Sequence, residues 1–141
     1  MMNKKLWYIF SWLTILTALS LMSVVIFWLI YPYKIVEFKE NTFTVLQKEV
    51  IQGGRLKYYV DYCKFTEKQP QTTRYFVDGV LYETPEISGG LDKGCYKIIR
   101  DIYIPKAIPK GNYKIKIVIK YKLNPIKSYE IVKYTEQFTI N

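Results

Sequence analysis

Hydrophobic and polar positions divide the chain into two parts. From Leu6 to Ile30 the sequence carries no charged side chain, and this run is longer than the roughly 18 apolar residues that already predict a membrane span. From Lys34 onward charged residues return, and apolar residues alternate with polar ones, as in half-buried strands. We therefore expect a short cytoplasmic tail at 1–5, a transmembrane helix at 6–31 and a β-sandwich domain at 32–141.

The apolar run is long for a cleaved signal peptide. A secretory signal has an apolar region of about 7–15 residues before a cleavage site with small residues. Ala18-Leu19-Ser20 is similar to such a site, but the apolar stretch LMSVVIFWLI follows it, and a removed signal has no need of it. We therefore favour a retained anchor over a cleaved signal.

Aromatic residues mark both ends of the run. Trp and Tyr side chains prefer the membrane–water interface, and Trp7 lies roughly 31 Å from Trp28 in a helix, close to the thickness of the hydrocarbon core. Pro32 is expected to end the helix. The residues expected at the interfaces are Trp7, Trp12, Trp28, Tyr31 and Tyr33.

Hydroxyl residues recur within the run. We expect them to bond to their own helix backbone. The alternative is a contact with a second helix, for which Thr14 and Ala18 form a minimal pair of small residues.

After Lys34 the pattern predicts strands separated by glycine and proline turns. The expected strands are Thr42–Leu46, Arg55–Thr66, Thr73–Thr84 with a hairpin at Asp78-Gly79, Tyr96–Ile104, Gly111–Pro125 and Tyr129–Ile140. Six or seven short strands at this spacing predict an all-β antiparallel sandwich.

The clearest strand reads GNYKIKIVIKYKLNP from Gly111 to Pro125. Successive side chains of a strand point to opposite faces, so one face is expected to be buried and the other to carry lysines. The residues expected to face inward are Tyr113, Ile115, Ile117, Ile119, Tyr121 and Leu123. Slipping the register by one residue would bury four ammonium groups, so the register is well specified.

The chain has two cysteines, Cys63 and Cys95. One pair in a small β-rich domain favours a disulfide in an oxidising compartment, and two free thiols are the alternative. We expect the bond to join a strand end to a loop, because Cys95 precedes the strand predicted at Tyr96. It would close a loop of about 33 residues and stabilise the fold by about 3–4 kcal/mol.

The positive-inside rule barely distinguishes the two ends of the run, since Lys4 and Lys5 precede it and other lysines follow it. Long C-terminal domains translocate largely regardless of charge. Together with the cysteines, this places the N-terminus in the cytoplasm and the domain outside it, at the inner membrane and in the periplasm if the host is a Gram-negative bacterium.

The domain is basic. After residue 33 the chain has 19 basic and 12 acidic residues, a formal charge of +7, although an AT-rich genome also produces lysine excess. No acidic residue lies between Ile102 and Tyr129, where a candidate basic surface comprises Lys106, Lys110, Lys114, Lys116, Lys120, Lys122 and Lys127. We favour a solvated sheet face, ahead of anionic lipid and an acidic protein partner. Nucleic acid comes last, because arginine is scarce.

The sequence contains no histidine, which removes the commonest general base and metal ligand. Two distant cysteines make no zinc site, and the Gly-Gly pairs lack the motif of a phosphate-binding loop. We therefore expect no catalytic residues, no metal, no cofactor and no enzymatic activity.

The pattern Pro-x-Gly-x-Tyr at Pro109–Tyr113 resembles the start of the penultimate strand of immunoglobulin-like sandwiches. This chain departs from antibody domains in having no tryptophan after Trp28. The segments VDYCKF, RYFVDG, IPKAIPKGNY and YKLNPIKS, and the pair GC, resemble those of small single-span proteins of bacteriophage genomes. That resemblance implies placement in a host cell envelope.

The resulting hypothesis is a non-enzymatic, single-pass membrane protein that presents an immunoglobulin-like domain for protein–protein contacts at the cell envelope. Its partners would be the lipid bilayer and a protein of unknown identity. The alternative is a surface-binding module that uses the lysine-rich strand face on anionic lipid or cell-wall polymer.

Overall fold

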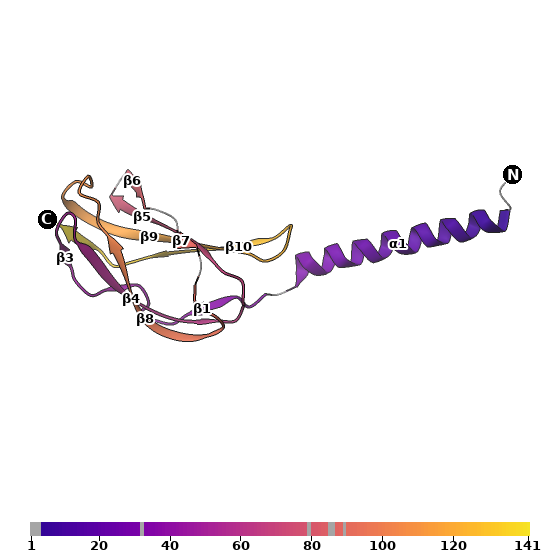
Figure 1. The fold of residues 1–141 in the computed structure, drawn as a ribbon, viewed down its shortest axis with the longest axis horizontal. Helices are drawn as coiled ribbons and strands as arrows, with labels where there is room; N and C mark the ends of the chain where they lie inside the picture. The colour runs from indigo at the N-terminus through magenta and orange to yellow at the C-terminus, as the bar shows by residue number, and fades with distance from the viewer. Residues whose placement is uncertain (1–3, 32, 79, 85–86, 89) are drawn as a thin grey trace. The chain divides into compact units, whose positions relative to one another are not determined.

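The computed structural model describes residues 4–31, 33–78, 80–84, 87–88 and 90–141. The chain forms two compact units, one of residues 1–33 with 124–127 and one of residues 34–123 with 128–141. The first contains the helix α1, and the second contains the β-strands. The prediction of a mostly β chain with one long apolar N-terminal helix is confirmed (Figure 1).

The helix α1 runs from Lys4 to Ile30, 27 residues in all. The helix is long enough and apolar enough to cross a membrane, with a mean hydropathy of 2.4 over an 18-residue window. The hydroxyls of Thr14, Thr17 and Ser23 each donate a hydrogen bond to the carbonyl four residues earlier. This confirms that these hydroxyls bond to their own helix backbone.

The second unit has a four-stranded and a seven-stranded sheet (Figure 1). The four-stranded sheet contains β1 (Val36–Phe38), β2 (Thr44–Val45), β4 (Arg55–Lys64) and β8 (Gly94–Tyr103). The seven-stranded sheet contains β3 (Glu49–Val50), β5 (Gln71–Asp78), β6 (Val80–Glu83), β7 (Ile87–Ser88), β9 (Gly111–Lys122), β10 (Ser128–Tyr134) and β11 (Phe138–Ile140).

Each sheet is organised around one long strand. β4 pairs with β8 along its whole length, and β1 and β2 pair with parts of its other edge. β9 pairs with β5 on one edge and with β10 and β11 on the other. All these pairs are antiparallel, whereas β3 and β11 run parallel. The hairpin predicted from Thr73 to Thr84 is confirmed by the pairing of β5 with β6, and Gly79 lies outside the described residues.

The core lies between the two sheets. All six residues predicted to face inward from the lysine-rich strand are buried, so its predicted register is confirmed. The facing strand β4 contributes Leu56, Tyr58 and Val60, which are also buried. Each large side chain removed from water in this way stabilises the fold by roughly 1.5–3 kcal/mol.

The single strand predicted at Tyr129–Ile140 is wrong, because the structure divides this segment into β10 and β11. Thr135 lies between them and is buried. The Thr135 hydroxyl oxygen accepts a hydrogen bond from the Ile115 backbone N–H at 3.0 Å, and the Thr135 backbone N–H donates to the Ile115 carbonyl. A side-chain oxygen thus replaces a backbone carbonyl as acceptor, and the regular ladder is interrupted there.

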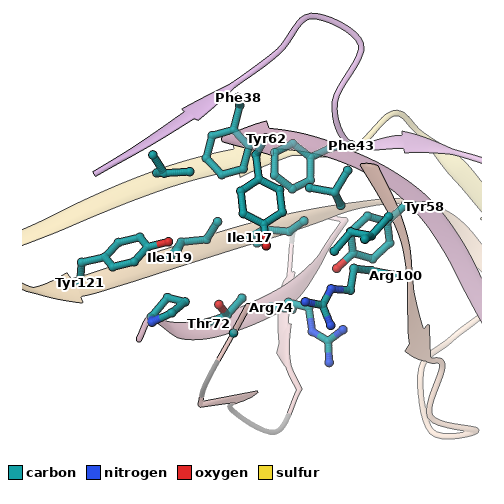
Figure 2. Close-up of a pocket in the computed structure, with 15 residues that line it drawn as sticks. Phe38, Phe43, Tyr58, Tyr62, Thr72, Arg74, Arg100, Ile117, Ile119 and Tyr121 are labelled. Carbon is teal, nitrogen blue, oxygen red and sulfur yellow. The ribbon is translucent and has the colours of Figure 1, made fainter. Parts of the chain in front are cut away.

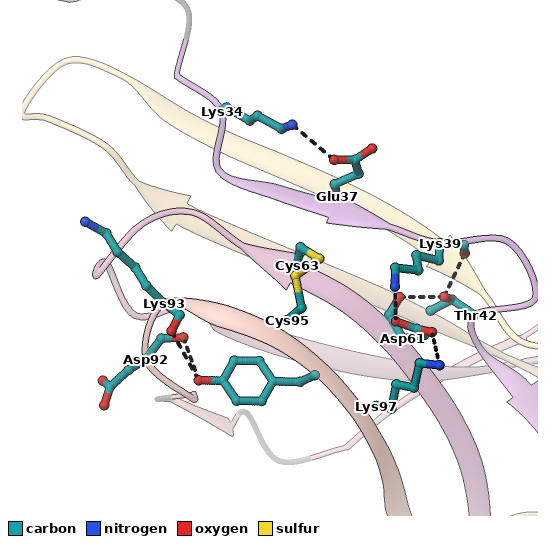
Figure 3. The surroundings of a disulfide bond; sticks show 11 residues. Lys34, Glu37, Lys39, Thr42, Asp61, Cys63, Asp92, Lys93, Cys95 and Lys97 are labelled. Carbon is teal, nitrogen blue, oxygen red and sulfur yellow. Dashed lines mark hydrogen bonds and ion pairs between the residues drawn. A yellow bond between two sulfur atoms is a disulfide. The ribbon is translucent and has the colours of Figure 1, made fainter.

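The predicted disulfide between Cys63 and Cys95 is present (Figure 3). The expectation that it joins a strand end to a loop is wrong. β8 begins at Gly94, which pairs with Lys64, so the two cysteines lie directly opposite each other on adjacent strands. The bond therefore lies within the four-stranded sheet and does not connect the two sheets.

We expect the double variant Cys63→Ser/Cys95→Ser to lose about 3–4 kcal/mol of unfolding free energy, because the unfolded chain is released from a closed loop. Denaturant titration of the purified protein measures this loss. Wild type under reducing conditions is the control and is expected to match the variant. Equal stability of the variant and oxidised wild type would contradict the prediction.

Candidate functional site

Four of the predicted surface lysines share one face of β9. Lys114, Lys116, Lys120 and Lys122 alternate with the buried residues of that strand and point away from the core. Among the described residues, none of the ion pairs involves these four side chains. Lys120 is paired across the sheet with Glu130 of β10, whereas the strand partners of Lys114, Lys116 and Lys122 among the described residues carry no negative charge. The charges of these three lysines are therefore available to an external partner.

Neighbouring strands add tyrosines and valines to the same face. Lys116 is paired across the sheet with Tyr75 of β5 and Tyr134 of β10, and its Nζ lies 5.9 Å from the centre of the Tyr75 ring. In the next row, Val118 lies between Thr73 and Val132. The exposed side chains of Tyr134 and Val132 have 55% and 40% of their surface accessible. We call this surface the β9 face, comprising Tyr75, Lys114, Lys116, Val118, Lys120, Lys122, Val132 and Tyr134.

The other predicted lysines lie elsewhere. Lys106 and Lys110 are exposed in the segment between β8 and β9, and Lys127 lies in the 124–127 segment, which belongs to the other compact unit. The structure therefore brings four of the seven lysines together on the sheet face.

The predicted interface aromatics lie near the two ends of α1. Trp7 and Trp12 lie in its first turns and are exposed, and Trp28 lies in its last turn. Tyr31 and Tyr33 follow the helix, with their ring centres 4.9 Å apart.

A cavity of about 280 Å³ lies between the two sheets. Inward-facing residues of β1, β4 and β8 line one wall, and those of β5 and β9 line the other (Figure 2). Most of the lining is aliphatic or aromatic. Phe43 reaches it from a left-handed backbone conformation with φ of 70°, which costs roughly 1–2 kcal/mol in a residue with a Cβ. Packing of its buried ring against Phe38, at 5.2 Å between ring centres, offsets this cost.

The cavity also contains two arginines that the sequence reasoning missed, Arg74 of β5 and Arg100 of β8. Each occupies an inward position on its strand, since Arg74 alternates with Phe76 and Arg100 with Ile102. This alternation is visible in the sequence and could have placed both arginines in the interior. A charged residue in the inward row of a predicted strand marks either an error of register or a polar site.

Burial raises the pKa of two tyrosines that line the cavity, Tyr62 and Tyr121. It raises the pKa of Tyr121 to about 12. Burial also raises the pKa of Tyr62, and the Arg100 guanidinium partly opposes that rise because it favours the phenolate. Both side chains are therefore neutral hydroxyls near neutral pH and are able to donate hydrogen bonds.

A second polar cluster lies on the outer face of the four-stranded sheet (Figure 3). The Asp61 carboxylate lies 3.6 Å from the Lys39 Nζ and 4.0 Å from the Lys97 Nζ, and it accepts a hydrogen bond from the Tyr59 hydroxyl. The Asp61 backbone carbonyl accepts a hydrogen bond from Thr42. Because these groups belong to the β1–β2 connection and to β4 and β8, the cluster holds that connection on the sheet.

No protein-family model matches this sequence, and none of the curated proteins does. Among solved structures, the chain is similar to Pseudomonas fluorescens alkylpurine DNA glycosylase AlkC bound to DNA containing an abasic site analog. The two share 12% sequence identity with a TM-score of 0.42, over 78% of this chain and 31% of the glycosylase chain.

This comparison corrects the expectation that the chain is not an enzyme, because the similar structure belongs to one. The sequence contains no histidine, but catalysis does not require that residue. At this identity and TM-score, the likeness carries no argument for glycosylase activity either.

We expect the tyrosinate absorbance of the folded protein to contain one component that titrates at about pH 12 and is lost in Tyr121→Phe. The stabilisation that results from the raised pKa of Tyr121 is fully present below pH 10. That contribution declines by about 1.4 kcal/mol per pH unit as the pH rises toward 12, because the unfolded state ionises first. Tyr103→Phe, which removes an exposed phenol, is the matched control. A titration curve unchanged by Tyr121→Phe would contradict the assignment.

Proposed function

We propose that this chain is a single-span membrane protein, with α1 as its anchor and its β-domain outside the cytoplasm. The 27-residue apolar helix supports the anchor, since none of its residues is buried in protein. The disulfide supports an oxidising compartment, because thiols in the cytosol are kept reduced. The sequence resemblance to small single-span phage proteins agrees with a place in a host envelope.

We also propose that the domain is immunoglobulin-like. In that fold one sheet holds strands A, B, E and D, and the other holds C, F and G, with an added C′ strand in variable-type domains. Here β4 has the neighbours expected of strand B, with β8 in the place of E, and β9 has those of strand F, between β5 and β10–β11. The Tyr113 hydroxyl donates to the Pro109 carbonyl at 3.0 Å, which matches the tyrosine corner at the start of strand F. The disulfide departs from the antibody pattern, since it joins strands of one sheet.

The function that we propose for this domain is to bind an acidic protein partner through the β9 face. The observation that carries the proposal is the arrangement of four lysines around exposed tyrosine and valine side chains, in no ion pair among the described residues. Tyrosine is enriched in protein interfaces, and surrounding charges steer the encounter and select the partner.

The membrane topology is tested by cysteine labelling in spheroplasts with a membrane-impermeant maleimide. We expect Cys63 and Cys95 to be labelled without lysis, and only after reduction, because the thiols are outside the cytoplasm and bonded. Asn3→Cys in the Cys63→Ser/Cys95→Ser background is the matched control and is expected to be labelled only after lysis. Labelling of Cys63 and Cys95 only in lysed cells would reject the proposed topology.

The β9 face is tested with two triple variants that remove the same charge. Lys114→Gln/Lys120→Gln/Lys122→Gln alters the face, and Lys48→Gln/Lys57→Gln/Lys68→Gln alters exposed lysines elsewhere. Lys116 is retained because it packs on Tyr75. We expect the first variant to recover the envelope partner at least about five-fold less than wild type, and the second to match wild type. Quantitative mass spectrometry of proteins captured from solubilised membranes gives the measurement.

Two outcomes would contradict protein binding. Equal recovery by both triple variants would show that the face is not the contact surface. A specific loss of binding to anionic liposomes or wall polymer in the first variant, with no change in the captured proteins, would support the surface-binding alternative.

A further inference from the structure

The cavity between the sheets contains a buried cation without an anionic partner. Arg74 has only 8% of its surface exposed. Its Nη1 donates to the Asp101 backbone carbonyl at 3.1 Å, but its Nε has no hydrogen-bond partner among the described residues. A guanidinium has five N–H donors and stays charged, so burying it with so few partners is costly.

The nearby carboxylate of Asp101 does not fill this role. It accepts a hydrogen bond from Arg55 at 2.6 Å on the outside of the sheet, which lowers the pKa of Asp101. The buried Lys64 shows the usual solution, since its Nζ donates to the Leu91 carbonyl at 2.7 Å and lies 3.4 Å from the Gln69 amide oxygen. Arg74 lacks such a set of partners on its Nε side.

A second cation lines the same cavity. Arg100 projects from β8 into the cavity. Its side chain is also exposed to solvent, so it lies where the cavity opens to the surface. Figure 2 shows the two arginines on the Tyr58 side of the cavity, away from Tyr121. No carboxylate is among the described residues that line the cavity. The arginine end therefore has the charge and the donors to hold an oxyanion.

The rest of the cavity is mostly apolar. Phe38, Phe43, Ile117 and Ile119 present carbon surface, and Tyr62 adds a hydroxyl. Protein interiors are normally close-packed, and ligand pockets range from about 300 to 1,000 Å³. A volume of about 280 Å³ suits a small molecule and excludes a long-chain lipid.

We propose that this cavity is a binding site for a small amphiphilic oxyanion, a carboxylate or phosphate on a short apolar body. The anionic group pairs with Arg74 and Arg100, and the apolar body lies between the sheets against Phe38 and Ile119. This site is separate from the β9 face, which lies on the opposite side of the larger sheet.

The test uses the full-length protein in nanodiscs of zwitterionic lipid and isothermal titration calorimetry, with empty nanodiscs subtracted. The probes are 4-phenylbutyrate, 4-phenylbutyl phosphate and the neutral 4-phenylbutanol, which share one apolar body. We expect one of the two anions to bind saturably at one site, at least about ten-fold more tightly than the alcohol. The preferred anion identifies the ligand as a carboxylate or a phosphate.

We expect Arg74→Gln and Arg100→Gln each to weaken binding of that anion by at least about ten-fold, because each removes charge-assisted hydrogen bonds. Lys57→Gln removes one charge from the outer face of β4 and is the matched control, with unchanged affinity. Circular dichroism reports whether Arg74→Gln folds. If Arg74→Gln does not fold, Arg100→Gln provides the test, because replacing an exposed side chain is not expected to prevent folding. Binding of the alcohol as tight as that of the anions, wild-type affinity in Arg100→Gln, or no saturable anion binding would each overturn the proposal.

Discussion

The hydrogen-bonded ladders along both edges of β9 determine the arrangement of the larger sheet. β5 pairs with one edge of this strand and β10 and β11 with the other, so three further strands take their register from it. The inward row of β9 is apolar, and its outward row is rich in lysine. A shift of one residue would bury the lysines and expose the isoleucines, so hydrophobic burial and charge solvation both select the same register. The β9 face and one wall of the cavity are consequences of that selection.

The long elements were predictable from sequence because their patterns repeat. β9 alternates over its whole length, and α1 is uninterrupted by charge, so each could be assigned with its buried or apolar residues. β1, β3 and β7 have only two or three residues and show no periodicity, and they form because β4, β11 and β5 offer free edges. The break between β10 and β11 depends on the hydroxyl of Thr135, which a pattern of apolar positions does not reveal.

The candidate sites were predictable to different degrees. The lysines of the β9 face follow from alternation alone, but Tyr75 comes from a strand distant in sequence, and placing Tyr75, Val132 and Tyr134 beside the lysines required the pairing register. Arg74 and Arg100 lie in two different sheets, and nothing in their local sequence indicates that they line one cavity. The local sequence likewise does not indicate that Cys63 and Cys95 lie directly opposite each other, because this depends on where β8 begins.

The position of the disulfide has a mechanical consequence. Because the bond ties β4 to β8, it resists sliding of these two strands and makes the smaller sheet a stiff plate. It does not set the distance between that plate and the larger sheet, which depends on non-covalent contacts such as side-chain packing and the hydrogen bond from Arg74 to the Asp101 carbonyl. Widening of the interior therefore breaks no covalent bond, and the molecule can adjust its internal volume while each sheet keeps its own shape.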